Sequence, residues 1–202
     1  MASLKQGSWL LVLLAVAGCT SSPTSQQGGA QSSDAERIHF VENRKVDPSV
    51  RRDFDVAMGL LRDEKYDEGI NLLKKVIEAS QNNSAPYINM AIAYEKLGKN
   101  DLAEDSLKQA LAINPDHPVA NNEYALLLRK TGKYAEARKL YERILKKYPD
   151  FMPARRNLGI LCDIYLNDKK CALKQYQIYG QAHPEDKKVE LWIVDLKKAS
   201  GK

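Results

Sequence analysis

The sequence predicts an all-α fold, an α-solenoid of about four helix-turn-helix units followed by a C-terminal capping helix. The main observation is a repeat: Ala91 and Ala125, Gly98 and Gly132, and Pro115 and Pro149 are each 34 residues apart. Between these positions apolar residues recur at intervals of three and four, the spacing of one helix face. The glycines fit the ends of first helices, and the prolines fit the ends of second helices. Such units bury their apolar faces only against their neighbours.

The first 18 residues stand apart from the repeats. Lys5 gives a basic start, and an uninterrupted apolar run from Trp9 to Ala17 follows. This run is too short to span a bilayer, which indicates a signal peptide over residues 1–18. The sequence Val16-Ala17-Gly18-Cys19 resembles the lipobox of bacterial lipoproteins, which implies cleavage before Cys19 and lipidation of Cys19. The alternative is an ordinary signal peptide cleaved nearby, with a chance cysteine.

Residues 19–47 are predicted to form a flexible tether. Ser, Thr, Gln and Gly dominate its first part. Several acyl chains on one residue anchor a protein stably to a membrane. Because Thr20 rather than Asp follows Cys19, the lipoprotein resemblance implies an outer-membrane anchor, with the protein on the periplasmic face of a Gram-negative envelope.

The solenoid is expected over residues 48–186, with repeats at about 50–83, 84–117, 118–151 and 152–186. Three departures from the pattern are visible. Glu64 stands where the next two repeats have glycine, and Gln81 stands where they have proline. Pro149 and Pro184 are 35 residues apart, which predicts one inserted residue, placed in the turn Leu166 to Lys170. Residues 187–202 are expected to form a capping helix and tail. The expected helices are 50–62, 66–79, 84–97, 101–113, 118–130, 134–147, 152–165, 170–182 and 186–199.

The pattern of small, aromatic and proline positions resembles the tetratricopeptide repeat family. Ala91, Tyr94, Gly98, Ala103 and Pro115 answer to Ala125, Leu128, Gly132, Ala137 and Pro149. The resemblance extends over Val50 to Asp186. It implies a right-handed superhelix whose concave face, lined by the first helix of each repeat, binds a peptide or another protein. It implies no chemistry of its own.

Positions on the first helices that are not needed between repeats form the candidate partner-binding groove. The polar candidates can hydrogen-bond a partner's backbone or carboxylate, and the apolar candidates belong to a stripe at one repeat offset. The alternative for the stripe is ordinary core packing. The candidates are Asn89, Asn122, Arg156, Asn157, Met58 and Ile92.

Two cysteines remain after Cys19, and both lie in the fourth repeat. In an oxidising periplasm Cys162 and Cys171 predict a disulfide, which would contribute about 2–3 kcal/mol by closing a short loop. The alternative is a pair of small buried thiols.

Charge and histidine placement argue against nucleic-acid binding and enzymatic activity. The net charge of +5 is spread over lysine pairs on helix surfaces, without a focused basic stripe. His39, His117 and His183 are isolated from one another, and no metal-ligand spacing or nucleophile–base arrangement is visible. We therefore expect no catalytic residue, metal or cofactor.

The function expected from these features is that of a periplasm-facing lipoprotein that serves as a protein–protein interaction scaffold for an envelope complex. Related lipoproteins take part in type IV pilus and secretin assembly or in energy transduction of the TonB type. The alternative is a structural envelope protein that binds peptidoglycan or self-associates through the solenoid edge.

Overall fold

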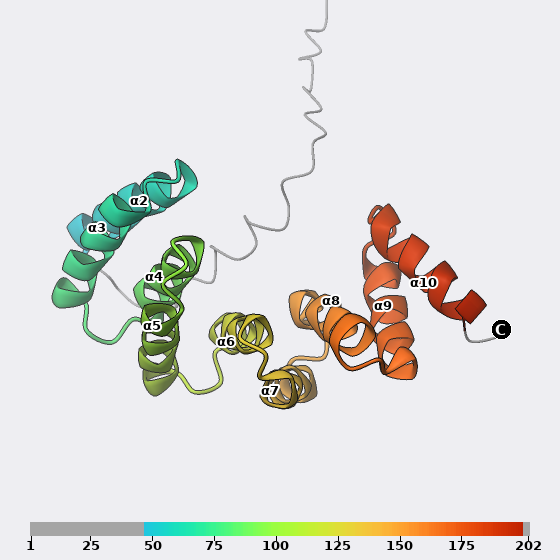
Figure 1. The fold of residues 1–202 in the computed structure, drawn as a ribbon. Coiled ribbons are helices and arrows are strands. Elements are labelled where there is room, and N and C mark those ends of the chain that lie inside the picture. Colours follow the sequence, from blue (N-terminus) through green and yellow to red (C-terminus); the bar gives the residue numbers. More distant parts are fainter. Residues whose placement is uncertain (1–46, 200–202) are drawn as a thin grey trace, which may run out of the picture. The chain divides into compact units, whose positions relative to one another are not determined.

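In a computed structural model of the chain, residues 47–199 are described, and this part is all helical (Figure 1). The all-α prediction is confirmed, and the observed helices match the expected ones to within two residues at each end when α8 and η1 are taken together as the expected helix 152–165. The predicted signal peptide, Cys19 and nearly all of the tether lie outside the described residues. The helices are α2 (Pro48–Arg62), α3 (Tyr66–Ala79), α4 (Ser84–Lys96), α5 (Asn100–Ile113), α6 (Pro118–Lys130), α7 (Tyr134–Lys147), α8 (Met152–Ile160), the π-helical turn η1 (Leu161–Tyr165), α9 (Lys169–Ala182) and α10 (Lys187–Ala199).

The helices pack in chain order, as a solenoid requires. The pairs α2/α3, α4/α5, α6/α7 and α8/α9 form hairpins, and each second helix also contacts the first helix of the next hairpin. Successive first helices touch as well: α2 contacts α4, α4 contacts α6, and α6 contacts α8. The first helices therefore form one layer and the second helices another.

The turn inside each hairpin needs one residue with left-handed backbone. Gly98 and Gly132 supply it with φ of 72° and 82°. Glu64 takes the same conformation with φ of 61°, so the first repeat keeps the turn without the glycine that favours it. In the fourth repeat Asn167 fills this role with φ of 50°.

The inserted residue of the fourth repeat lies inside the helix, which corrects the expectation that it lies in the turn. From Ala125 to Gly132 is 7 residues, whereas from Gly159 to the equivalent Asn167 is 8. The extra residue is absorbed by η1, in which the Leu166 N–H donates to the Leu161 carbonyl, five residues back, at 3.1 Å. A π-helical hydrogen bond joins residues five apart, whereas an α-helical one joins residues four apart, so the π-helical turn accommodates one extra residue.

Small residues let the paired helices approach closely. Ala57, Ala91, Ala103, Ala125 and Ala137 all have 0% exposed surface. A larger side chain at any of them would force two helices apart. These positions are therefore structural.

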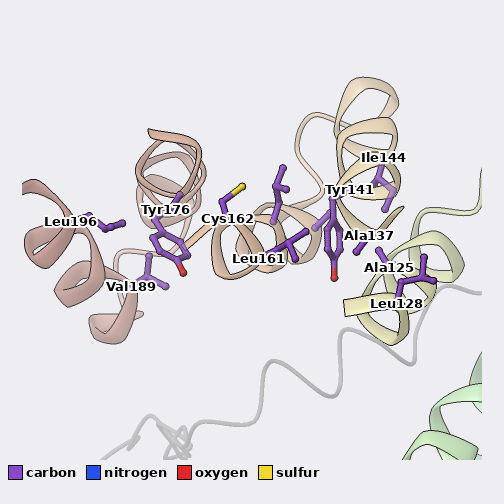
Figure 2. Packing of buried hydrophobic residues seen from close by; sticks show 13 residues of the cluster. Ala125, Leu128, Ala137, Tyr141, Ile144, Leu161, Cys162, Tyr176, Val189 and Leu196 are labelled. Atoms are coloured by element: carbon purple, nitrogen blue, oxygen red, sulfur yellow. The ribbon is translucent and has the colours of Figure 1, made fainter. Parts of the chain in front are cut away.

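The largest buried cluster joins the third and fourth repeats to α10 (Figure 2). Tyr141 and Tyr176 are its largest buried side chains, and Val189 and Leu196 of α10 complete it. Gly159 makes room for Tyr176, because a Cβ atom at residue 159 would lie 2.4 Å from the tyrosine ring. Two further clusters lie in the first three repeats. Among residues 47–199, no helix is long and apolar enough to cross a membrane.

Candidate functional site

Two of the predicted asparagines meet between adjacent first helices. Asn157 Nδ2 of α8 donates a hydrogen bond to Asn122 Oδ1 of α6 at 3.1 Å. Asn122 Nδ2 in turn donates to Glu123 Oε1 at 3.0 Å. All three side chains are buried. This chain of hydrogen bonds fixes the spacing of α6 and α8, and it keeps the Glu123 carboxylate buried.

Asn89 lies apart from this chain. It is buried on α4, and its Nδ2 donates to the Ala85 carbonyl of the same helix at 2.9 Å. The amide is thereby oriented by its own helix rather than by a neighbouring repeat. A direct contact of Asn89 with a partner stays a prediction.

The two apolar candidates lie against the core. Met58 is 5% exposed and belongs to the cluster that contains Leu73 and Tyr94. Ile92 is partly buried and packs against the cluster around Ile88 and Val119. The structure thus assigns both side chains a packing role, the alternative that the sequence leaves open. Their contact with a partner stays a prediction.

Arg156 of α8 is the polar candidate that remains accessible. Its side chain is 34% exposed, and its guanidinium carbon lies 5.6 Å from the centre of the Trp192 ring of α10. Its Nε is 3.7 Å from Asp186, which is a long ion pair. The aromatic ring and the distant carboxylate orient the guanidinium while leaving donors available.

A second arginine, Arg129 at the end of α6, has a similar environment that the site prediction missed. Its guanidinium carbon lies 5.6 Å from the centre of the Tyr165 ring. Its Nε is buried and has no hydrogen-bond partner among the described residues. Tyr165 is 43% exposed and also contacts the ring of Tyr134, with centroids 4.9 Å apart. The π-helical turn places Tyr165 here, so the extra residue in the 35-residue spacing was the available sequence signal.

The charges of this region act on one buried hydroxyl. Burial raises the pKa of Tyr176, and the nearby Asp163 carboxylate raises it further, while Arg156 and Arg129 oppose the shift. Arg129 and Arg156 lie on α6 and α8, first helices that contact each other. We call the surface formed by Arg129, Arg156, Asp163, Tyr165 and Trp192 the arginine–aromatic face.

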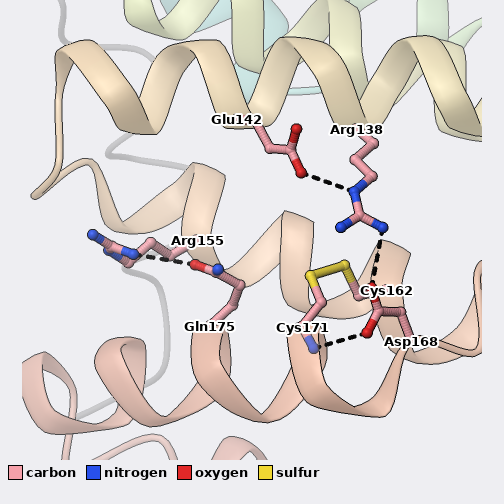
Figure 3. Close-up of a disulfide and its surroundings, with 7 residues drawn as sticks. All are labelled: Arg138, Glu142, Arg155, Cys162, Asp168, Cys171 and Gln175. Carbon is pink, nitrogen blue, oxygen red and sulfur yellow. Dashed lines mark hydrogen bonds and ion pairs between the residues drawn. A yellow bond between two sulfur atoms is a disulfide. The ribbon is translucent and has the colours of Figure 1, made fainter.

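The two cysteines of the fourth repeat form a disulfide (Figure 3). It joins Cys162 at the π-helical turn to Cys171 in the first turn of α9, with Cα atoms 5.9 Å apart. Asp168 caps α9 by accepting the Cys171 N–H at 3.0 Å, and it also accepts a hydrogen bond from Arg138 at 3.1 Å. The hydrogen bond from the Cys171 N–H, helped by Arg138, holds the pKa of Asp168 below its usual range.

Cys162, Asp168 and Cys171 are also close enough together to suggest metal ligands. However, a metal would need free thiolates, and these two sulfur atoms are bonded to each other. The site is therefore structural, and it fixes the hairpin of the fourth repeat.

Comparisons with known proteins agree with this architecture. Residues 88–161 match a family model described as tetratricopeptide repeat. Tetratricopeptide repeat protein 16 of Homo sapiens is 34% identical over 126 residues, which cover 62% of this chain and 14% of that protein. Its counterpart from Macaca fascicularis is 32% identical over 126 residues, with the same coverage. The chain thus spans only about 14% of the length of these relatives.

Several solved structures share the fold. PilF of Pseudomonas aeruginosa has a TM-score of 0.69 at 18% identity, covering 75% of this chain and 68% of its own. PilW, described as a widely conserved type IV pilus biogenesis factor, has a TM-score of 0.68 at 23% identity, covering 77% and 72%. MamA residues 41-end from Desulfovibrio magneticus RS-1 has a TM-score of 0.65 at 20% identity, covering 77% and 88%. At these identities the similarity shows the fold alone.

Proposed function

We propose, from a solenoid whose repeats the comparisons support as tetratricopeptide repeats, that this chain is a docking scaffold for another protein in a bacterial envelope. The scaffold is anchored to the outer membrane through lipid on Cys19 and faces the periplasm. It serves the assembly of a type IV pilus or its secretin. Energy transduction of the TonB type is the second pathway that fits an anchored periplasmic scaffold.

The arginine–aromatic face is the observation that carries this proposal. Arg129 and Arg156 come from neighbouring first helices, and each is held by an aromatic ring rather than by a close carboxylate. Arg129 Nε is buried and has no hydrogen-bond partner in the described part of the chain, so the Tyr165 ring is the contact that orients this guanidinium. Exposed aromatic and arginine side chains are the residue types enriched at protein interfaces. Tetratricopeptide repeat scaffolds are in general not enzymes.

Two further observations support the envelope location and the pilus pathway, respectively. The lipobox-like sequence before Cys19 supports an envelope location. PilF and PilW share the fold over about three quarters of this chain, and PilW is described as a type IV pilus biogenesis factor. Neither observation depends on the arginine–aromatic face.

A second candidate function is a structural one, in which the chain binds peptidoglycan or self-associates through the solenoid edge. The observation that favours it is the exposed apolar surface of α10, where Leu191 is 63% exposed. In that case the arginine–aromatic face would play no part.

The test is a deletion strain complemented with variants of the full chain. Secretin multimers and surface pili should be lost on deletion and restored by the wild type. The double variant Arg129→Glu/Arg156→Glu should fail to restore them. Lys146→Glu, a charge reversal on the exposed side of α7, is the matched control and should restore them. Cys19→Ser should release the chain from the membrane fraction.

Normal secretin multimers and pili in the deletion strain would refute the pathway. Full rescue by the double variant would refute the docking face. Sedimentation of the purified wild-type chain with peptidoglycan, unchanged in the double variant, would favour the structural alternative.

A further inference from the structure

Helix α10 lies at the C-terminal end of the solenoid, where the first helix of a fifth repeat would lie. Ala57, Ala91, Ala125 and Gly159 follow one another at 34-residue steps, and a step of 35, the interval from α8 to α10, leads to Val194. The first four positions are buried, because the second helix of each repeat packs on them. Val194 is 41% exposed. Val194 is larger than the alanine or glycine at this position of the repeats, but it is apolar and no helix of the described chain covers it, so α10 presents an exposed apolar side chain here.

A cavity of about 740 Å³ opens at this place between α9 and α10. Ile178 and Gly180 of α9 and Ile193 and Val194 of α10 contribute its apolar lining. In the fourth repeat the corresponding face of α8 is covered by α9, whose Tyr176 packs on Gly159. The cavity thus lies where the second helix of a fifth repeat would pack.

The rim of the cavity is basic, because its carboxylates already interact with other residues and two of its lysines do not. Glu190 is paired with Lys187 at 3.1 Å, and Asp186 is engaged by Tyr179 and Arg156. Lys174 and Lys197 also line the cavity, and neither forms an ion pair with any residue of the described region. An occupant with carboxylates at its flanks would complement these two ammonium groups.

We propose that the α9–α10 cavity receives an amphipathic helix from a partner protein, with an apolar stripe flanked by Asp or Glu. The partner helix completes a fifth hairpin in trans, in the manner of a helix bound in an apolar groove. A second copy of this chain fits less well, because α10 carries Lys187, Lys188, Lys197 and Lys198, and two such helices would repel each other. This surface is distinct from the arginine–aromatic face, so either can fail without the other.

The probe is a fluorescein-labelled peptide based on α7, a second helix of this same chain. In the acidic version, Glu replaces the five Lys and Arg residues of Tyr134–Lys147; the control version keeps the natural residues. Fluorescence anisotropy with the full chain measures binding. We expect the acidic peptide to bind at least tenfold more tightly than the basic one.

Two variants test the location. Val194→Glu should weaken binding of the acidic peptide at least tenfold, and Lys197→Glu should weaken it several-fold. Both side chains are exposed, so helicity measured by circular dichroism should be unchanged. Val56→Glu on α2, also an exposed valine at 56%, is the matched control and should leave binding unchanged.

Three results would overturn the proposal. The first is no binding of the acidic peptide, and the second is equal binding by the wild type and Val194→Glu. The third is a wild-type chain that dimerises in sedimentation velocity and becomes monomeric with Val194→Glu, because the occupant would then be a second copy.

Discussion

Replacement of Gly159 by alanine tests the packing that holds the fourth repeat together. An alanine Cβ at this position would lie 2.4 Å from Tyr176 Cε1 and 2.5 Å from Cδ1. Real side chains do not approach so closely, and Tyr176 is only 1% exposed. The Tyr176 ring cannot move into solvent without opening the cluster around it (Figure 2). Helices α8 and α9 must therefore separate to admit the alanine.

The magnitude follows from two opposing effects. Overpacking of a close-packed core costs about 1–3 kcal/mol. Alanine in place of glycine in a helix interior stabilises by about 1 kcal/mol. Gly59 of α2 isolates the second effect, because nothing lies within 4 Å of a Cβ built there. We therefore expect Gly159→Ala to be less stable than Gly59→Ala by about 1–3 kcal/mol.

The assay is urea denaturation of both variants and the wild type, followed by circular dichroism. Gly59→Ala should be at least as stable as the wild type, whereas Gly159→Ala should unfold at a lower urea concentration. Equal stabilisation by the two substitutions would refute the close approach of α8 and α9 at Gly159.

Three further predictions concern local features. Glu64→Gly should raise the free energy of unfolding by about 1 kcal/mol, because glycine adopts the left-handed backbone without strain. Lys74→Gly, the control inside α3, should lower it by a similar amount, because glycine is a poor helix former. Asp168→Ala should cost about 1 kcal/mol at pH 7 in urea titrations. The hydrogen bond from the Cys171 N–H lowers the pKa of Asp168, so the difference in free energy of unfolding between the wild type and Asp168→Ala should shrink as pH falls below about 4. A difference that persists at pH 2 would contradict the role of Asp168 as a charged helix cap. Reduction of the Cys162–Cys171 bond should cost about 2–3 kcal/mol, and an unchanged melting curve in dithiothreitol would argue against it.

The fold could be predicted from the sequence because the repeat signals are local and redundant. Alanines at 34-residue steps mark close helix contacts, and a left-handed residue marks each hairpin turn, so several positions indicate each helix independently. The position of the inserted residue was wrong because proline spacing counts residues without saying which hydrogen bonds they make. Only the backbone shows that η1 absorbs the insertion.

The candidate site was predictable only in part. The repeat register identifies which residues lie on the first helices, and on that basis Asn122, Asn157 and Arg156 were predicted. It does not tell an asparagine that bonds a neighbouring repeat from one that faces a partner, and the Asn122–Asn157 hydrogen bond is of the former kind. Arg129 needs Tyr165 to complete its environment, and Tyr165 reaches it through the π-helical turn.

Site-specific photo-crosslinking in living cells tests the docking function most directly. A photoreactive phenylalanine derivative replaces Tyr165 on the arginine–aromatic face, which keeps both arginines, and in a parallel strain it replaces Lys146 on the opposite helix layer. We predict one defined crosslinked complex from position 165 that contains a subunit of the pilus or secretin machinery, and none from position 146. The same products from both positions, or no product from position 165, would contradict the proposal that this face is where the partner docks.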